Sequence, residues 1–212
     1  MIDVSTREIF CYAQGGPEWI EGRRGCATSS RFDDVMATIK SGEAASRRNY
    51  RIQLALERIT GVVQPSFVSG PMADGSEREP SARLAFEAAT GLIAQEVGLV
   101  KVGEWLACSP DGLIDDDEGL ECKCYIPANH YATLLAQAMP EKHKAQVQGN
   151  IWLSGRRRWH FASWNPLFPP RLQLFHAVVE RDDAYIVKLA AEVEKFLAEV
   201  AEAVTKLEKL NV

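Results

Sequence analysis

One short stretch, residues 109–124, constrains the fold of this chain more than any other, with the sequence S-P-D-G-L-I-D-D-D-E-G-L-E-C-K-C. Pro-Asp-Gly is a turn sequence, the run of acids is typical of a loop, and the apolar residues around them have the spacing of short strands. The stretch therefore predicts a tight β-hairpin. Because side chains alternate along a strand, Glu121 and Lys123 share one face and the two neighbouring cysteines share the other. Such a hairpin brings Asp111 alongside Glu121.

Asp111, Glu121 and Lys123 together form a cluster with defined chemistry. Two carboxylates on one face are hard oxygen ligands suited to magnesium or manganese, and an adjacent ammonium can orient or help to deprotonate a water molecule. Phosphodiester hydrolysis needs this combination, although a surface Glu–Lys pair beside a turn-capping aspartate has the same pattern. A calcium loop fails, because the register places no glycine at position 6 and no glutamate at position 12 counted from Asp111. A zinc site at Cys122 and Cys124 lacks a second cysteine pair.

The rest of the chain predicts a single domain over residues 1–212 in which helices cover a sheet. A chain of 212 residues, 46% of them hydrophobic, can bury roughly 70% of its unfolded surface in one core. A long C-terminal helix is expected at about 183–210, where a buried stripe packs against the domain or a neighbouring subunit. Further helices are expected over 46–60, 81–96, 128–138 and 141–153, and strands over 104–108, 112–114, 120–125, 158–164 and 172–180.

The charge is unevenly distributed. The net charge is −5, yet residues 104–121 contain seven carboxylates and no Lys or Arg. Basic clusters around this acidic patch suit a protein that holds phosphates next to a metal, and solvated surface charge gives the same pattern. The sequence has no secretory signal, no run of ~18 apolar residues and no C-x-x-C pair among its five cysteines. We therefore expect a cytoplasmic protein with free thiols and no membrane partner.

The hairpin and other segments resemble the motifs of a known family. S-P-D-G-L and G-L-E-C-K-C look like the active-site hairpin of the lambda exonuclease family, also called YqaJ-type viral recombinases, within the PD-(D/E)xK nuclease superfamily. In the family's order, the chain also carries W-I-E-G-R-R-G-C-A-T-S-S at 19–30, G-S-E-R-E-P-S-A-R at 75–83, A-Q-V-Q at 145–148 with Trp152, and V-V-E-R-D at 178–182. These segments extend over most of the chain, so chance agreement is improbable.

This resemblance implies a fold and a function. The fold is an α/β (α+β), restriction-endonuclease-like core with a central mixed β-sheet flanked by helices. The function is that of a magnesium-dependent, processive 5′→3′ exonuclease on linear double-stranded DNA. It releases 5′-mononucleotides and leaves 3′ single-stranded tails for phage-type recombination in a bacterial host. A ring-shaped homotrimer around the DNA and a single-strand annealing partner are implied as well.

The resemblance also implies roles for individual residues. Asp111 and Glu121 bind two magnesium ions, for which manganese can substitute, and the backbone carbonyl of Cys122 is a further ligand. Lys123 positions the nucleophilic water. Taken from the residues alone, a polar side chain on a helix usually faces solvent. Two such helix residues complete the implied catalytic set: Glu79, near metal-bound water, and Gln146, near the nucleophile.

DNA contacts are implied outside the hairpin. Arg23 and Ser30 form a pocket for the 5′-phosphate, since a guanidinium and a hydroxyl both donate to phosphate oxygens. Arg24 is an adjacent competitor for that role, and Met72 falls where the family places an apolar wedge that parts the terminal base pairs. A separate hypothesis from the basic cluster assigns contacts with the DNA backbone to Arg47, Arg48 and Arg51.

Two alternatives remain open at this point. One is a RecB-like or Cas4-like nuclease of the same superfamily; Cas4-like chains usually hold an iron–sulfur cluster with three late cysteines, whereas no cysteine follows Cys124 here. The other is a catalytically inactive module that binds DNA ends, against which the presence of all three charged hairpin residues argues. Tyr125 stands where the family commonly has proline, which alters how the strand ends.

Overall fold

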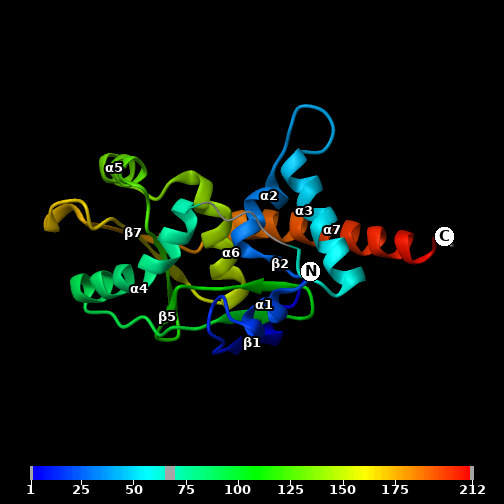
Figure 1. Ribbon diagram of the computed structural model, residues 1–212, viewed down its shortest axis with the longest axis horizontal. Coiled ribbons are helices and arrows are strands. Elements are labelled where there is room, and N and C mark those ends of the chain that lie inside the picture. Colours follow the sequence, from blue (N-terminus) through cyan, green and yellow to red (C-terminus); the bar gives the residue numbers. More distant parts are fainter. Residues whose placement is uncertain (1, 65–69, 211–212) are drawn as a thin grey trace.

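Two four-stranded sheets with helices around them make up the computed structural model, which describes residues 2–64 and 70–210, with side chains for 2–64 and 77–210 (Figure 1). This is the mixed α/β fold expected from the sequence. The first sheet has the order β1-β3-β4-β2 and the second β5-β6-β7-β8, and each contains one parallel pair. The strands are β1 (Arg7–Phe10), β2 (Ala27–Thr28), β3 (Leu99–Val102), β4 (Leu106–Cys108), β5 (Gly112–Ile114), β6 (Glu118–Lys123), β7 (Arg158–Trp164) and β8 (Leu174–Glu180).

Seven α-helices surround these strands in the described part of the chain. They are α1 (Pro17–Arg23), α2 (Phe32–Met36), α3 (Ala45–Thr60), α4 (Gly70–Thr90), α5 (Pro127–Ala136), α6 (Lys144–Ser154) and α7 (Asp183–Glu208). Short 3₁₀ segments lie at Val4–Thr6, Ser29–Arg31, Glu141–His143 and Pro170–Leu172. None of the described helices combines the length and hydropathy needed to cross a membrane.

The predicted hairpin is present as β5 and β6. Its register pairs Gly112 with Leu120, and the acidic residues of the turn are exposed, as expected. Asp115 has a left-handed backbone (φ 43°), a conformation that aspartate tolerates better than most residues. The buried Arg156 closes the turn from inside: its Nη1 donates to the carbonyl oxygens of Ile114, Asp115 and Glu118 at 3.1, 2.6 and 2.9 Å.

Helices cover both faces of the second sheet. On one face, Ala82 and Phe86 of α4 pack against Leu120 and Cys122 of β6. The alternation of the strand directs Glu121 to the opposite face, where α6 passes through the middle of the molecule (Figure 1). β6 thus separates an apolar layer from a polar site.

The long C-terminal helix α7 packs on the rest of the chain over most of its length. Its apolar stripe is buried from Ile186 to Val200, and Phe196 stacks on Tyr50 of α3 with ring centroids 5.4 Å apart. Val204 is half-buried and Leu207 is 46% exposed. The last turns of α7 extend beyond the body of the molecule (Figure 1).

Two parts of the expected secondary structure were wrong. The helix expected over 81–96 begins at Gly70 and passes through Pro80, although proline ordinarily begins a helix or breaks it. It ends at Thr90 because Gly91 adopts a left-handed conformation (φ 73°). Five short elements were not expected: the strands β1, β2 and β3 and the helices α1 and α2. None of them has more than seven residues, which is short for a hydrophobic periodicity to show.

Candidate active site

Asp111 and Glu121 lie next to each other at the open end of the hairpin. The backbone N–H of Asp111 donates to the carbonyl of Leu120 at 3.2 Å. In return, Oδ2 of Asp111 accepts the backbone N–H of Cys122 at 2.6 Å. These two bonds fix the Asp111 side chain against β6, beside Glu121, which is the juxtaposition that the hairpin predicted.

The carboxylate of Glu121 is buried, with 2% of the residue exposed, and accepts three side-chain hydrogen bonds. Its Oε1 accepts from Lys123 Nζ and from Gln146 Nε2, both at 2.6 Å. Its Oε2 accepts from Nδ2 of Asn150 at 3.0 Å. The structure therefore brings Lys123 and Gln146 to one carboxylate, and α6 supplies two of its donors.

Burial, together with neighbouring carboxylates, raises the pKa values of two acidic groups at this point. Burial raises the pKa of Asp111 well above its usual value, and the charges of Glu121 and Glu79 raise it further. Burial also raises the pKa of Glu79, with Lys123 opposing and Glu121 adding to the shift. Burial alone would lower the pKa of Lys123, but the charges of Glu121 and Asp111 outweigh it and raise it. Lys123 is therefore an ammonium group at neutral pH.

The donor set fits a hard divalent cation. The charge of Lys123 lowers the pKa values of Asp111 and Glu79, but burial and the neighbouring carboxylates outweigh it. Among the described residues, no three His, Cys, Asp or Glu side chains form a complete metal cage. Magnesium does not need one, because proteins usually bind it through one or two carboxylates together with water and substrate phosphates. The carboxylates of Asp111 and Glu121 meet that requirement; the carbonyl of Cys122 remains a predicted ligand.

The thiols of the hairpin strand have a different environment. Cys122 packs in the apolar layer, and Cys124 packs against it. Burial raises the pKa of both thiols, that of Cys124 to about 12, so both are protonated at neutral pH. All five cysteines of the chain are free. Because the thiolate and not the thiol binds a metal, protonated thiols in an apolar layer argue against a zinc site at Cys122 and Cys124.

A second polar group lies beside the carboxylates, at the carboxyl ends of β2 and β4. Because these two strands are parallel, both segments leave the sheet at the same edge, with Ser30 just after β2 and Ser109 directly after β4. Nη1 of Arg23 donates to Oγ of Ser109 at 2.7 Å, and its guanidinium lies over the Trp19 ring, 4.3 Å from the centroid. Ser30 is exposed, and its Oγ is 3.3 Å from the hydroxyl of Thr28.

The electrostatic state of Arg23 suits an anion. Burial lowers the pKa of Arg23, but a guanidinium stays protonated in proteins. None of the ion pairs between described residues involves Arg23, whereas Arg24 pairs with Glu21 at 2.5 Å on the surface. Of the two neighbouring arginines, Arg23 is the one whose charge is not matched by a bound carboxylate.

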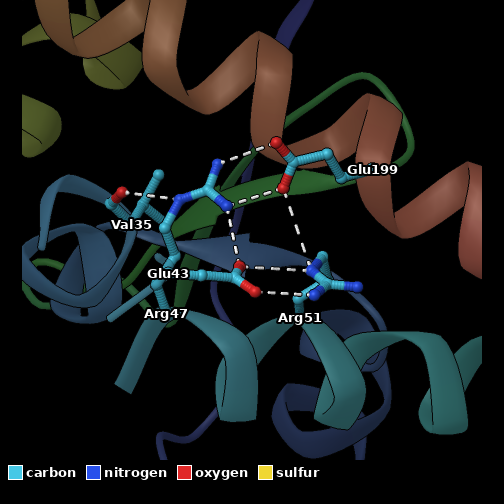
Figure 2. A network of polar contacts seen from close by, with 5 residues as sticks. All are labelled: Val35, Glu43, Arg47, Arg51 and Glu199. Carbon is cyan, nitrogen blue, oxygen red and sulfur yellow. Dashed lines mark hydrogen bonds and ion pairs between the residues drawn. The ribbon is translucent and has the colours of Figure 1, made fainter. Parts of the chain in front are cut away.

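Two of the three arginines of α3 predicted to contact DNA, Arg47 and Arg51, have carboxylate partners (Figure 2). Arg47 is buried and donates to both oxygens of Glu199, at 2.6 and 3.2 Å, and to Glu43 at 2.9 Å. Arg51 pairs with Glu43 at 2.7 Å. This network lines a groove of about 980 Å³ between α7 and the segment before α3, which none of the hairpin residues lines. A DNA-backbone contact remains a prediction for the three arginines, of which Arg48 alone is exposed.

Two further predicted features can be placed. The side chain of Met72 lies outside the described residues. Tyr125 follows the end of β6: its carbonyl accepts from Nδ2 of Asn165 at 2.8 Å, and its hydroxyl contacts Nε2 of His143. Burial lowers the pKa of His143 to about 3 and raises that of Tyr125 to about 12, so a neutral phenol contacts a neutral imidazole. The tyrosine in place of proline leaves Glu121 and Lys123 on their strand.

Sequence reasoning missed three residues at the site. Ser109 is the first, and its position next to Pro-Asp-Gly was the available signal. Arg83 is the second; it donates to the carbonyl of Asp111 at 3.3 Å and pairs with Glu96 at 2.7 Å. Asn150 is the third, and its only signal was its position one helical turn after Gln146.

Comparisons with known proteins identify the family of the chain. The family model of the YqaJ-like viral recombinase domain matches residues 18–157. The uncharacterized protein ExoD of Escherichia coli (strain K12) is 28% identical over 71 residues, which cover 34% of this chain and 80% of that protein.

Solved structures are similar over almost the whole chain. The crystal structure of an alkaline exonuclease, LHK-Exo, from Laribacter hongkongensis superposes with a TM-score of 0.85 at 34% identity, covering 92% of this chain and 97% of that one. The same exonuclease in complex with dAMP gives 0.84. A phage-related exonuclease from Haemophilus somnus 129PT, with 14% identity and a TM-score of 0.67 over 86% of this chain and 94% of its own, shares the fold.

Proposed function

The chain belongs to the YqaJ-like viral recombinase family and is a nuclease of the phage exonuclease type, and we propose that it is a magnesium-dependent 5′→3′ exonuclease on linear double-stranded DNA. One observation carries the proposal. The buried carboxylate of Glu121 is held by Lys123 and Gln146 beside Asp111, two residues along the chain from the hydroxyl of Ser109 that Arg23 binds. A site for hydrolysis thus adjoins a site for a phosphate.

The residues of the hairpin would have separate roles in hydrolysis. Asp111 and Glu121 would hold the metal, which polarises the scissile phosphate and lowers the pKa of a bound water. The ammonium of Lys123, fixed by Glu121, donates a hydrogen bond to the attacking water and orients it for in-line attack. Gln146 holds the same oxygen of Glu121 and so lies close to that water. Burial raises the pKa of Glu79, which makes this carboxylate a stronger base than an ordinary glutamate.

Arg23, Ser30 and Ser109 would bind the terminal 5′-phosphate. Because Oγ of Ser109 accepts hydrogen bonds from both Arg23 and Trp19, its own hydrogen is available to a phosphate oxygen. The water then attacks the next phosphate, and the bond between that phosphorus and the 3′ oxygen of the terminal nucleotide breaks. A 5′-mononucleotide leaves, and the shortened strand carries a new 5′-phosphate. The complex of LHK-Exo with dAMP, a 5′-mononucleotide, supports this product.

Assembly and partners are also part of the proposal. A homotrimeric ring would make the enzyme processive, because a closed ring cannot readily leave the strand that it encircles. Its 3′ single-stranded tails would be the substrate of a single-strand annealing protein in phage-type recombination, in the cytoplasm of a bacterial host. Family membership supports these statements.

Digestion of end-labelled linear duplex DNA tests the function. We expect magnesium to support loss of the strand that begins with a 5′-phosphate and release of mononucleotides, and manganese to substitute. EDTA should stop the reaction. Binding of DNA ends without degradation in either metal would make the chain an end-binding module, and nicking of closed circular DNA would identify an endonuclease instead.

The phosphate pocket makes a separate prediction. Replacing Arg23 with glutamine removes a charged donor to the terminal phosphate, so we expect the preference for 5′-phosphate over 5′-hydroxyl ends to fall by about tenfold to a hundredfold. Arg24→Gln is the matched control, since Arg24 pairs with Glu21 on the surface. The initial rates of both variants on both kinds of end give the ratio. An unchanged ratio in Arg23→Gln would remove the residue from the pocket.

A further inference from the structure

Asn150 holds the carboxylate of Glu121 from the side opposite to Lys123. The residue is completely buried on α6, and its Nδ2 donates to Oε2 of Glu121 at 3.0 Å. Because a carboxylate oxygen accepts and does not donate, this contact fixes which end of the amide faces Glu121. The other end, Oδ1, is buried and has no hydrogen-bond partner among the described residues.

A second buried amide on the same helix shows why Asn150 is unusual. Gln148 is 2% exposed and uses both ends of its amide: Nε2 donates to the carbonyl of Glu180 at 2.8 Å, and Oε1 accepts from the N–H of Asp182 at 2.9 Å. Gln148 thereby ties α6 to the segment between β8 and α7. Asn150 leaves the oxygen of its amide without a hydrogen bond, which costs stability. An apolar residue of the same size would avoid that cost, and the hydrogen bond that it would lose is the one to Glu121.

The two oxygens of Glu121 depend on different donors. Gln146 and Asn150 are one helical turn apart and share a face of α6. Oε1 has two donors, Lys123 and Gln146, and keeps one of them if the other is lost. Oε2 has Asn150 as its side-chain donor in the described part of the chain.

A hydrogen-bond donor on each oxygen of Glu121 prevents the carboxylate from rotating. The terminal torsion of a glutamate side chain has a broad preference, so the chain itself hardly restricts the carboxylate plane. Glu121 is buried, and solvent therefore cannot replace a missing donor. Without Asn150 the carboxylate can turn about its bonds to Lys123 and Gln146, and its free lone pairs no longer point in one direction.

We propose that Asn150 is a positioning residue, which orients Glu121 as a ligand for the divalent cation. This inference rests on the proposed metal-dependent function, because it assigns a role toward the metal and not toward the DNA. Asn150 acts through Glu121 and does not touch the substrate. Side chains that orient metal ligands typically change metal affinity by about 10–100-fold when they are removed.

The test compares two near-isosteric replacements on α6. Asn150→Leu and Gln148→Met each delete one buried amide, and both are expected to lower the temperature of thermal unfolding. Titration of the DNA-free proteins with manganese, followed by calorimetry, should show affinity about 10–100-fold weaker in Asn150→Leu and unchanged in Gln148→Met. In digestion assays, Asn150→Leu should need more magnesium for half-maximal rate, whereas the requirement of Gln148→Met should match that of the wild type.

Several outcomes decide the matter. Wild-type manganese affinity in a folded Asn150→Leu protein overturns the inference, as does equal weakening in both variants, which would mark a general effect of loosening α6. If Asn150→Leu does not fold by circular dichroism, Asn150→Ser serves in its place, because serine is smaller and its hydroxyl does not reach as far as the amide. A wild-type protein that binds manganese but digests no DNA would contradict the proposed function alone.

Discussion

Replacing Lys123 with alanine is expected to lower the rate of duplex digestion by about 10²–10⁴-fold, the range for removing a group that orients or protonates reactants in the transition state. Nζ of Lys123 is 2.6 Å from Glu121, and the charges of Glu121 and Asp111 keep it protonated. Alanine leaves no cation to orient the water. Single-turnover digestion of 5′-phosphorylated duplex at saturating magnesium measures the effect on chemistry.

Lys144→Ala is the matched control for this change. Lys144 lies on α6 and also contacts a carboxylate, that of Asp182 at 3.5 Å, but none of its polar contacts with described residues is with the hairpin. We expect this variant to digest DNA at the wild-type rate. Retention of more than a tenth of the activity by a folded Lys123→Ala protein would show that another group orients the water.

Replacing Asp111 with asparagine is expected to separate metal binding from stability. Asparagine keeps an oxygen that can accept the N–H of Cys122, so the hairpin should form. It supplies no negative charge, and we expect manganese affinity to fall on the order of 10²-fold or more, since a direct ligand is lost. Digestion should fall below detection at ordinary magnesium concentrations.

The same change should make the metal-free protein more stable at neutral pH. The pKa of Asp111 is raised in the folded state, so its contribution to stability is full below the usual pKa of aspartate and is lost as the pH rises through the raised value. An amide cannot ionise and avoids that loss. The unfolding temperature of Asp111→Asn in EDTA should therefore exceed that of the wild type near pH 8, and the difference should narrow in acid.

Asp115→Asn is the control for both measurements. Asp115 belongs to the same hairpin but is exposed at the turn, and asparagine tolerates its left-handed backbone. Its metal affinity and activity should match those of the wild type. Adding magnesium should raise the unfolding temperature of the wild type and of Asp115→Asn but leave that of Asp111→Asn unchanged; a similar rise in all three would place the metal elsewhere.

Much of the site was predictable because it is local in sequence. The hairpin, the shared face of Glu121 and Lys123 and the approach of Asp111 follow from turn residues and from strand alternation, which act over a few residues. The same holds for the apolar stripe of α7. Short motifs in a fixed order added Gln146, which the structure places 2.6 Å from Glu121.

What the sequence determined, then, was the hairpin, the type of most of the longer elements and the identity of the charged cluster. Only the tertiary structure decided which donors complete that cluster. Ser109 and Arg23, which are hydrogen-bonded, are 86 positions apart in the sequence, and Asn150 and Glu121 are 29 positions apart. Arg47, which looked available for DNA, is bound by Glu199 at a separation of 152. Partners so distant are set by how helices dock on sheets, and no local propensity encodes that docking.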